Sequence, residues 1–463
     1  MAISGQKVHL FVLHHGLWGN KNHLQYITKQ LNEAYKDKIH TLNVAVNEAK
    51  LTYDGVDLCG DRLVEKVRKE VEVLEKEGKV VDKCSFFGYS LGGLITRYAI
   101  GALGESGFFD KHEPINFTTF ATPHVGVQQP SSNTRARIFN YLSKRLLSRS
   151  GEQMSLADSY RDGRPLLEIM ASPDHEFMKH MARFQHRFIY ANGVNDRSVP
   201  YWTAAFEHTN YFTSIKALDI EFDENFNSVV KSFDLRDPNV KYVPPKKPFT
   251  KWTILKYVFF LVLPVLLPLW ITIALSVVLT QGTGSRIRVA GILRKAASQI
   301  QETPNTSKAN NQIEDAKVSP TISLGSLSDS SDSQQNGEHN TVDKFLDETV
   351  LVPALDGVNF PGEENLRSDD DSNSSEDVVI DIATQSSAFN VQPGKRIAES
   401  YKPLDLLPSQ KNIVSDMNKL SWKKVILVID SMNAHAAIVV RENRFDSASA
   451  RVGVKHYIQT IQI

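Results

Sequence analysis

Short apolar runs alternate with amphipathic stretches over the first half of the chain. The run at residues 8–13 (VHLFVL) is typical of a strand buried on both faces, and further strands are predicted at 39–46, 85–89, 116–121 and 187–191. Apolar residues recur at helical spacing between them, at residues 62–77 and 91–103. Strands that alternate with helices in this way predict an α/β domain with a mainly parallel sheet.

The pattern changes to amphipathic helices between residues 127 and 184, where apolar residues alternate with Arg and Lys. An insertion of this kind after a sheet strand is typical of a lid over a site. A structural subdomain is the alternative.

Two later segments interrupt the globular pattern. Residues 257–280, from Tyr257 to Thr280, contain no charged residue and are numerous enough to cross a bilayer. Residues 298–400 are rich in Ser, Asp, Asn and Gln, which predicts disorder. The apolar run at 424–429 (KVILVI) then predicts a final buried strand.

These changes divide the chain into four parts. We expect a core at 1–245 with a lid at about 127–184, a membrane-inserting segment with basic flanks at 246–295, a disordered Ser/Asp-rich region at 296–400, and the C-terminal part of the core at 401–463.

Composition narrows the classes of function. The chain has 53 basic and 53 acidic residues among 463, so no net positive charge favours nucleic acid as a partner. The two cysteines, Cys59 and Cys84, have no paired C-x-x-C spacing, so neither a disulfide framework nor a zinc site is expected. We expect no cofactor and no metal. Residues 1–7 lack an apolar leader, which favours a cytosol-facing protein.

The sequence Gly88-Tyr89-Ser90-Leu91-Gly92 has the G-x-S-x-G spacing of a nucleophile elbow. It follows a predicted strand and opens a predicted helix, which is the strand–turn–helix context that an elbow requires. A chance glycine-rich turn is the alternative. In this context we predict Ser90 as the nucleophile of a serine hydrolase.

A second motif, His15-Gly16-Leu17-Trp18-Gly19, directly follows the first strand. Acyl transfer needs two backbone N–H donors directed at the tetrahedral oxygen. We expect one from Leu91, just after the nucleophile, and the other from Leu17 in this turn. His14 and His15 are alternative catalytic histidines, although a histidine in such a motif usually braces the loop.

The acid and base of a triad should follow later strands. Asp196 lies in a loop after the strand at 187–191, which fits the chain order Ser, Asp, His. A turn-forming Asn-Asp pair is the alternative interpretation. The candidate bases are His208, His339, His435 and His456, and His435 follows the final strand most closely. We predict that His435 deprotonates Ser90 and that Asp196 orients the imidazole.

His124 ends the strand after the elbow helix, in FATPH, at the sheet edge where ligands bind in such folds. It could line the site, but we favour a structural role.

The motifs HHGLWGN, TYDG followed by GDRL, GYSLGGLITRYAIG, FATPH, NDRSVPYWTA and AHAAIVVR resemble those of the fungal putative serine-esterase lipases. The similarity is greatest to the branch of yeast lipid-droplet phospholipases. It runs from about residue 7 to 212 and from about 420 to the end. The resemblance implies an α/β-hydrolase fold, hydrolysis of acyl chains from glycerophospholipids, and Ser90, Asp196 and His435 as catalytic positions. Related members act on neutral glycerides.

The apolar run separates Ser90 and Asp196 from His435, and a single membrane span would place His435 across the bilayer. Pro264 and Pro268 would break a continuous helix, and basic residues flank both ends of the run. We therefore predict a hairpin that returns to its own side. It fits the monolayer of a lipid droplet, and also the endoplasmic reticulum membrane, with the catalytic domain facing the cytosol.

The main hypothesis is a membrane-associated serine lipase that hydrolyses glycerophospholipids. An acylglycerol lipase and a protein acyl-thioesterase are alternatives with the same triad. An inactive membrane scaffold, whose acidic segment recruits partners, is the alternative from another class. Protein partners, head group and acyl-chain preference are left open by the sequence.

Overall fold

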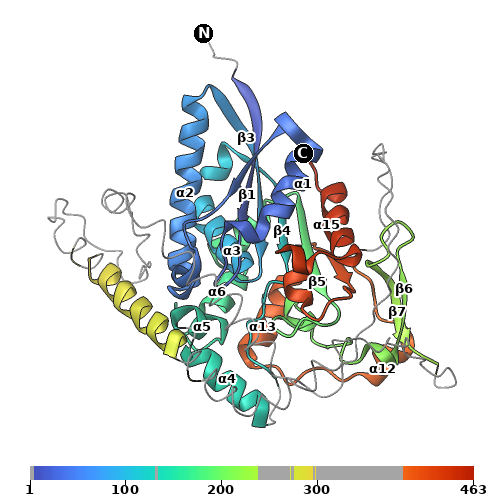
Figure 1. The fold of residues 1–463 in the computed structure, drawn as a ribbon. Helices are drawn as coiled ribbons and strands as arrows, with labels where there is room; N and C mark the ends of the chain where they lie inside the picture. Colours follow the sequence, from blue (N-terminus) through green and yellow to red (C-terminus); the bar gives the residue numbers. More distant parts are fainter. Residues whose placement is uncertain are drawn as a thin grey trace.

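Six parallel strands form the central sheet, in the order β2-β1-β3-β4-β5-β8 (Figure 1). A computed structural model describes residues 5–130, 134–146, 148–237, 272, 276–295, 298 and 389–463. The strands of the sheet are β1 (Gln6–His14), β2 (Ile39–Asn43), β3 (Lys79–Tyr89), β4 (Glu113–Phe120), β5 (His186–Asn192) and β8 (Lys423–Leu427).

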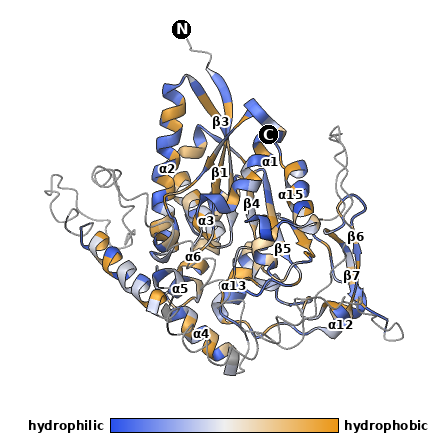
Figure 2. Cartoon of the chain, viewed as in Figure 1, coloured by the Kyte–Doolittle hydropathy of each residue, from blue (hydrophilic) through white to orange (hydrophobic). Residues whose placement is uncertain are grey.

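Helices cover both faces of this sheet. On one face lie α1 (Gln25–Tyr35) and α15 (Ala448–Thr460). On the other lie α2 (Val56–Lys76), α3 (Leu91–Glu105), α6 (Leu166–Ala171), α7 (Glu176–Met181) and α13 (Pro408–Met417). Along β1, Leu10 and Val12 enter one core while Phe11 and Leu13 enter the other, so the strand is apolar on both faces. Figure 2 shows orange stretches along the central strands, between blue ones. This architecture confirms the predicted α/β-hydrolase fold.

The remaining elements are short. The helices are α8 (Tyr201–Ala204), α12 (Lys395–Ser400) and α14 (Ala434–Ala437), and the 3-10 turns are η1 (Lys21–Leu24), η2 (Lys36–Lys38), η3 (Ala49–Tyr53), η4 (Phe108–Asp110), η5 (Ile215–Ala217) and η7 (Asn443–Phe445). A separate antiparallel pair is formed by β6 (Leu218–Phe222) and β7 (Val230–Leu235).

Two elements begin earlier than the hydrophobic pattern predicts. Helix α2 starts at Val56 rather than at residue 62, because Gly55 adopts a φ of 110° that lets the chain turn into the helix. Strand β3 starts at Lys79 rather than at residue 85. The hydrophobic pattern missed residues 79–84 because they include Lys and Asp and are only partly buried.

The insertion at 127–184 contains α4 (Thr134–Leu146), α5 (Ser148–Met154), α6 and α7. Helices α6 and α7 belong to the hydrophobic core, with Leu166, Ile169 and Phe177 buried. Helix α4 differs, because Ile138, Tyr141 and Leu142 are 54%, 56% and 40% exposed. The lid hypothesis therefore concerns α4 rather than the whole insertion.

Order resumes before the predicted boundary at residue 401, which corrects that prediction. The amide of Gly394 donates to the carbonyl of Phe233, and Ile397 of α12 is fully buried against β7. Hydropathy did not predict this ordered segment, because its residues are mostly polar and α12 buries only one side chain, Ile397.

The predicted membrane segment and disordered region lie largely outside the described residues. Residues 276–295 form a helix that borders the same side of the molecule as α4 (Figure 1). Among the residues that the structure describes, no helix combines the length and apolar character needed to cross a bilayer.

Candidate active site

Ser90 occupies a sharp turn between β3 and α3. Its φ of 54° lies in the left-handed region, a strained conformation for a residue with a side chain. The turn is held by a 2.9 Å hydrogen bond from the Ser90 amide to the carbonyl of Phe120. A Cβ at Gly88 would stand 2.3 Å from Cα of Gly93, so the strand and helix can approach this closely only with glycine. The predicted elbow context is therefore present.

Three side chains meet at the carboxyl ends of three strands. Oγ of Ser90, after β3, lies 3.0 Å from Nε2 of His435, which is in α14 just beyond β8. Nδ1 of His435 lies 2.9 Å from Oδ2 of Asp196, in the loop after β5. With the proton on Nδ1, the imidazole donates to Asp196 and accepts from Ser90. The structure thus brings together all three residues that the sequence predicts as a triad.

Both oxygens of Asp196 are held in place. Oδ1 accepts hydrogen bonds from the amides of Ser198 (3.1 Å) and Val199 (2.7 Å). Oδ2 accepts from Nδ2 of Asn192 (2.8 Å) in addition to His435. The side chain is 1% exposed. Such fixation lets a carboxylate orient an imidazole and stabilise its cation.

Two residues that the sequence analysis missed hold the His435 loop. The hydroxyl of Tyr89 donates to the carbonyl of His435 (2.8 Å), and Asn192 also donates to the carbonyl of Ala434 (3.2 Å). Tyr89 and Asn192 are the last residues of β3 and β5. Their positions at the carboxyl ends of the strands could have indicated them.

The turn after β1 lies directly against the nucleophile. A Cβ at Gly16 would stand 2.8 Å from Cβ of Ser90. The backbone of this turn can therefore lie so close to Ser90 only because residue 16 is glycine. Within the part of the chain that the structure describes, the amides of Leu17 and Leu91 donate no hydrogen bond. Both are therefore available as donors to an oxyanion, and their role as the oxyanion pair stays a prediction.

His14 and His15 are fully buried beneath this turn. Burial lowers the pKa of His14 to about 4 and the pKa of His15 well below its usual value, so both are neutral at pH 7. Nδ1 of His14 donates to the carbonyl of His15 (2.8 Å), and Nδ1 of His15 to the carbonyl of Gly16 (3.0 Å). These contacts brace the loop.

The other candidate histidines lie elsewhere. His124 is buried and contacts Thr119 Oγ1 (2.9 Å) and Arg97 (3.3 Å), and burial lowers its pKa well below its usual value. His456 on α15 contacts the hydroxyl of Tyr190 (2.8 Å). His208 is exposed, and His339 lies outside the described residues.

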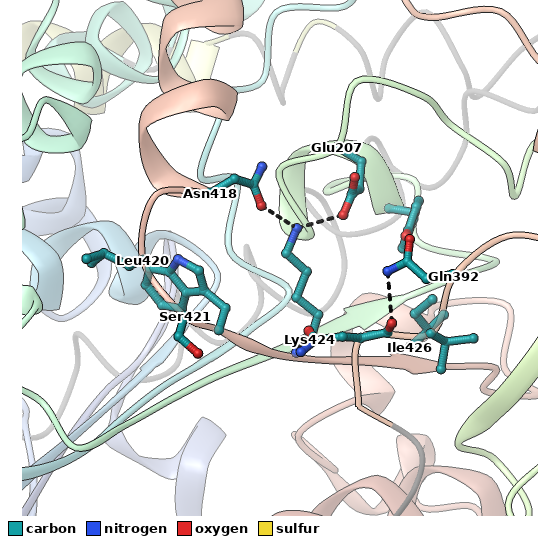
Figure 3. A pocket seen from close by; sticks show the side chains of 11 residues that line it. Glu207, Gln392, Asn418, Leu420, Ser421, Lys424 and Ile426 are labelled. Atoms are coloured by element: carbon teal, nitrogen blue, oxygen red, sulfur yellow. Dashed lines mark hydrogen bonds and ion pairs between the residues drawn. The ribbon is translucent and has the colours of Figure 1, made fainter.

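The described residues contain no group of three or more His, Cys, Asp or Glu that could hold a metal ion. Cys59 and Cys84 are free and buried, and burial raises the pKa of Cys59 to about 12. A cavity of about 390 Å³ opens beside β8, where Lys424 binds Glu207 (2.6 Å) and Asn418 (2.9 Å) (Figure 3). None of the three triad side chains lines it.

Residues 4–209 match the model of a family described as "Putative serine esterase (DUF676)". The match covers less than half of the chain. The match includes Ser90 and Asp196, and His435 lies beyond it. Residues 4–209 are thus similar to a family of serine esterases, and the fold of the described residues is that of an α/β-hydrolase.

The curated proteins that are similar to this chain are fungal. "Putative lipase ROG1" of Saccharomyces cerevisiae is 35% identical over 213 residues, covering 44% of this chain and 30% of that protein. "Putative lipase C4A8.10" of Schizosaccharomyces pombe is 30% identical over 209 residues, covering 43% of this chain and 26% of that protein. The matches thus span less than a third of these relatives' length. Among solved structures, "Phospholipase PlaB from Legionella pneumophila" is 15% identical with a TM-score of 0.25, covering 44% of this chain and 42% of that one.

Proposed function

We propose that this esterase hydrolyses acyl ester bonds of glycerophospholipids through a Ser90–His435–Asp196 triad. The observation that carries the proposal is the continuous hydrogen-bonded series from Ser90 Oγ through His435 to the buried Asp196. The elbow strain at Ser90 and the close approach of Gly16 support it further.

The chemistry follows from these positions. Nε2 of His435 takes the hydroxyl proton as Oγ of Ser90 bonds to the ester carbonyl carbon. The amides of Leu17 and Leu91 stabilise the oxyanion. When the ester C–O bond breaks, His435 returns the proton to the leaving alcohol oxygen. A water molecule, deprotonated by His435, then attacks the acyl carbon, the acyl–Oγ bond breaks to release the fatty acid, and His435 returns the proton to Oγ of Ser90.

A lipid surface as partner is supported by two helices. Helix α4 exposes Ile138, Tyr141 and Leu142, and the helix at 276–295 exposes Leu279, Ile287 and Leu293. Both segments contain Arg and Lys and neither contains Asp or Glu. Apolar side chains with basic neighbours favour binding to a phospholipid surface with anionic head groups.

The proposed hairpin topology, with the apolar run at 257–280 inserted from the cytosolic side, is supported by contacts on both sides of the run. Beyond it, Ser285 and Arg288 bind Asp54, and His435 binds Asp196. A crossing would separate these pairs. We propose a lipid-droplet monolayer, and also the endoplasmic reticulum membrane, as the location.

Ser90→Ala tests the enzymatic proposal directly. With full-length protein and phosphatidylcholine–phosphatidylserine vesicles, fatty acid release should fall by at least about a thousandfold. Labelling by a fluorophosphonate should also be lost. Ser232→Ala, at an exposed position on β7, should match the wild type.

The alternatives appear as distinct outcomes. Wild-type protein that neither releases fatty acid nor accepts the probe would favour the inactive scaffold. Labelling of Ser90 with turnover of acylglycerols or acyl-thioesters, but not phospholipids, would assign another substrate. Protease access to tags after Thr250 and after Ile463 in intact membranes tests the topology, and protection of either tag contradicts the hairpin.

A further inference from the structure

Asp54 is a fully buried carboxylate that joins two distant segments of the chain. It follows η3, within the TYDG motif, and its side chain is 0% exposed. Oδ2 accepts a 2.6 Å hydrogen bond from Arg62 of α2, in the GDRL motif. Oδ1 accepts from Oγ of Ser285 and from a guanidinium nitrogen of Arg288, both at 2.7 Å. The triad does not use this carboxylate.

Ser285 and Arg288 belong to the helix described at 276–295, whose residues 276–280 are also the last residues of the apolar run that ends at Thr280. Further contacts hold this helix on the core. Arg288 also donates to the carbonyl of Lys50 (3.2 Å), and Oγ of Ser148 donates to the carbonyl of Gly282 (3.5 Å). The helix therefore binds η3 and the start of α5.

One route leads from Asp54 to the turn after β1 through η3. Oγ1 of Thr52 accepts a 3.0 Å hydrogen bond from the amide of Trp18, the residue after Leu17. The amide of Ala49 donates to the carbonyl of Gly19 (2.9 Å). Both ends of η3 thus hold the backbone next to the proposed oxyanion donor.

A second route runs through buried side chains. Arg62, paired with Asp54, donates to Oδ1 of Asn47 (3.3 Å). Nδ2 of Asn47 donates to Nε2 of His14 (2.9 Å), and Nδ1 of His14 donates to the carbonyl of His15. The peptide group of that carbonyl joins His15 to Gly16, where an added Cβ would stand 2.8 Å from Cβ of Ser90.

Charge explains why the helix matters for Asp54. A buried carboxylate is stable only when its oxygens are paired, and removal of a partner is strongly destabilising. Ser285 and Arg288 supply both donors to Oδ1. Without them, Arg62 would be the one remaining partner of the Asp54 carboxylate among the residues that the structure describes. We expect η3 to shift so that the unpaired oxygen of Asp54 reaches water.

We propose that Arg288 and Ser285 are positioning residues for ester hydrolysis. By pairing with Asp54 they fix η3 and the backbone of Leu17, so the helix that leaves the apolar run supports the oxyanion side of the active site. The proposal rests on the proposed esterase function and adds a support that comes from outside the family-matched residues.

The test uses full-length protein in detergent with a soluble short-chain p-nitrophenyl ester. Arg288→Ala should lower kcat by about tenfold or more and leave KM within about twofold, because oxyanion stabilisation acts on the transition state. Lys411→Ala removes a positive charge from an exposed position of α13, outside the two proposed lipid-binding helices, and should match the wild type. Arg288→Lys, which keeps the charge, should recover part of kcat.

A second variant covers the case in which Arg288→Ala fails to fold. Ser285→Ala removes one hydrogen bond and should lower kcat by about threefold at unchanged KM. Wild-type kcat in both variants, with Ser90→Ala inactive, would overturn the positioning role while leaving the esterase proposal intact. An increase in KM alone would also overturn it. Wild-type protein without Ser90-dependent turnover would instead refute the proposed function, and this inference with it.

Discussion

Nδ2 of Asn192 donates a 2.8 Å hydrogen bond to Oδ2 of Asp196, the oxygen that also accepts from Nδ1 of His435. The same amide donates to the carbonyl of Ala434, the residue before His435. One buried side chain at the end of β5 therefore holds the carboxylate and the loop of the imidazole together. Partners that orient a functional side chain in this way affect activity without touching the substrate.

Asn192→Ala should lower kcat by about tenfold at nearly unchanged KM, because the carboxylate and the His435 loop lose a shared support. Asp196→Asn should cost far more, about ten thousandfold, since the wrong imidazole tautomer would face Ser90. Steady-state kinetics on a soluble ester measures both. Equal losses in the two variants would contradict a supporting role for Asn192.

A second prediction concerns the elbow. Gly88→Ala would place a methyl group 2.3 Å from backbone Cα of Gly93, and neither segment can move without disturbing Ser90. We expect the free energy of unfolding to fall by more than about 2 kcal/mol. Gly291→Ala is the control, on the helix at 276–295, where an added Cβ would have no neighbouring atom within 4 Å. This substitution should be neutral or slightly stabilising. Urea unfolding distinguishes the two, and equal stabilities would contradict the packing argument.

The elbow could be predicted because its requirements are local. A strand, a serine between glycines and a helix occupy contiguous residues, and backbone sterics link them. Chain order then narrowed the choice of Asp196 and His435, whose strands pair in register as β5 and β8. The parallel sheet followed from strands that are apolar on both faces.

The hydrogen-bond network around Asp54 could not be predicted, because its residues do not recur at a regular spacing along the sequence. Asp54 and Arg62 lie eight residues apart, but Arg288 is 234 residues from Asp54. Hydrogen bonds of this kind depend on tertiary packing, which hydropathy does not record. The order at 389–400 was missed for a related reason, since Ile397 is buried by β7 and not by its sequence neighbours.

A third prediction concerns pH. Burial, with a smaller effect from the charge of Asp57, raises the pKa of Asp61 to about 7, and its Oδ1 has no partner among the described residues. The folded chain thus holds a proton that the unfolded chain releases near pH 4. Asp61 therefore makes stability fall as pH rises from about 4 to about 7, and the loss remains above pH 7.

Asp61→Asn removes this titration. The stability gain of the variant over the wild type should be larger at pH 8 than at pH 5, by at most about 3 kcal/mol. Thermal unfolding at both pH values measures it. Asp37→Asn, at an exposed position, should show no such pH-dependent gain. A gain for Asp61→Asn that is equal at the two pH values would contradict the raised pKa.

The last prediction tests the lipid surface through α4. Ile138, Tyr141 and Leu142 are the exposed apolar side chains of a helix whose charged residues are all basic. Replacing all three with serine removes the apolar contacts with lipid while the basic charge remains. Loss of three half-exposed side chains from an interface corresponds to about 2 kcal/mol, or roughly thirtyfold in binding.

Hydrolysis of vesicle phospholipids should therefore fall by at least about tenfold in this triple variant, while hydrolysis of a soluble ester should stay within about twofold. The matched control replaces Val73 and Val80, which are 47% and 43% exposed on α2 and β3, with serine. Because these residues lie away from α4, the control should keep both activities. Equal loss on vesicles and on the soluble ester would show that α4 supports the fold or the site itself. Unchanged vesicle hydrolysis would exclude α4 as the lipid-binding surface and leave the apolar run at 257–280 and the helix at 276–295 as the remaining candidates.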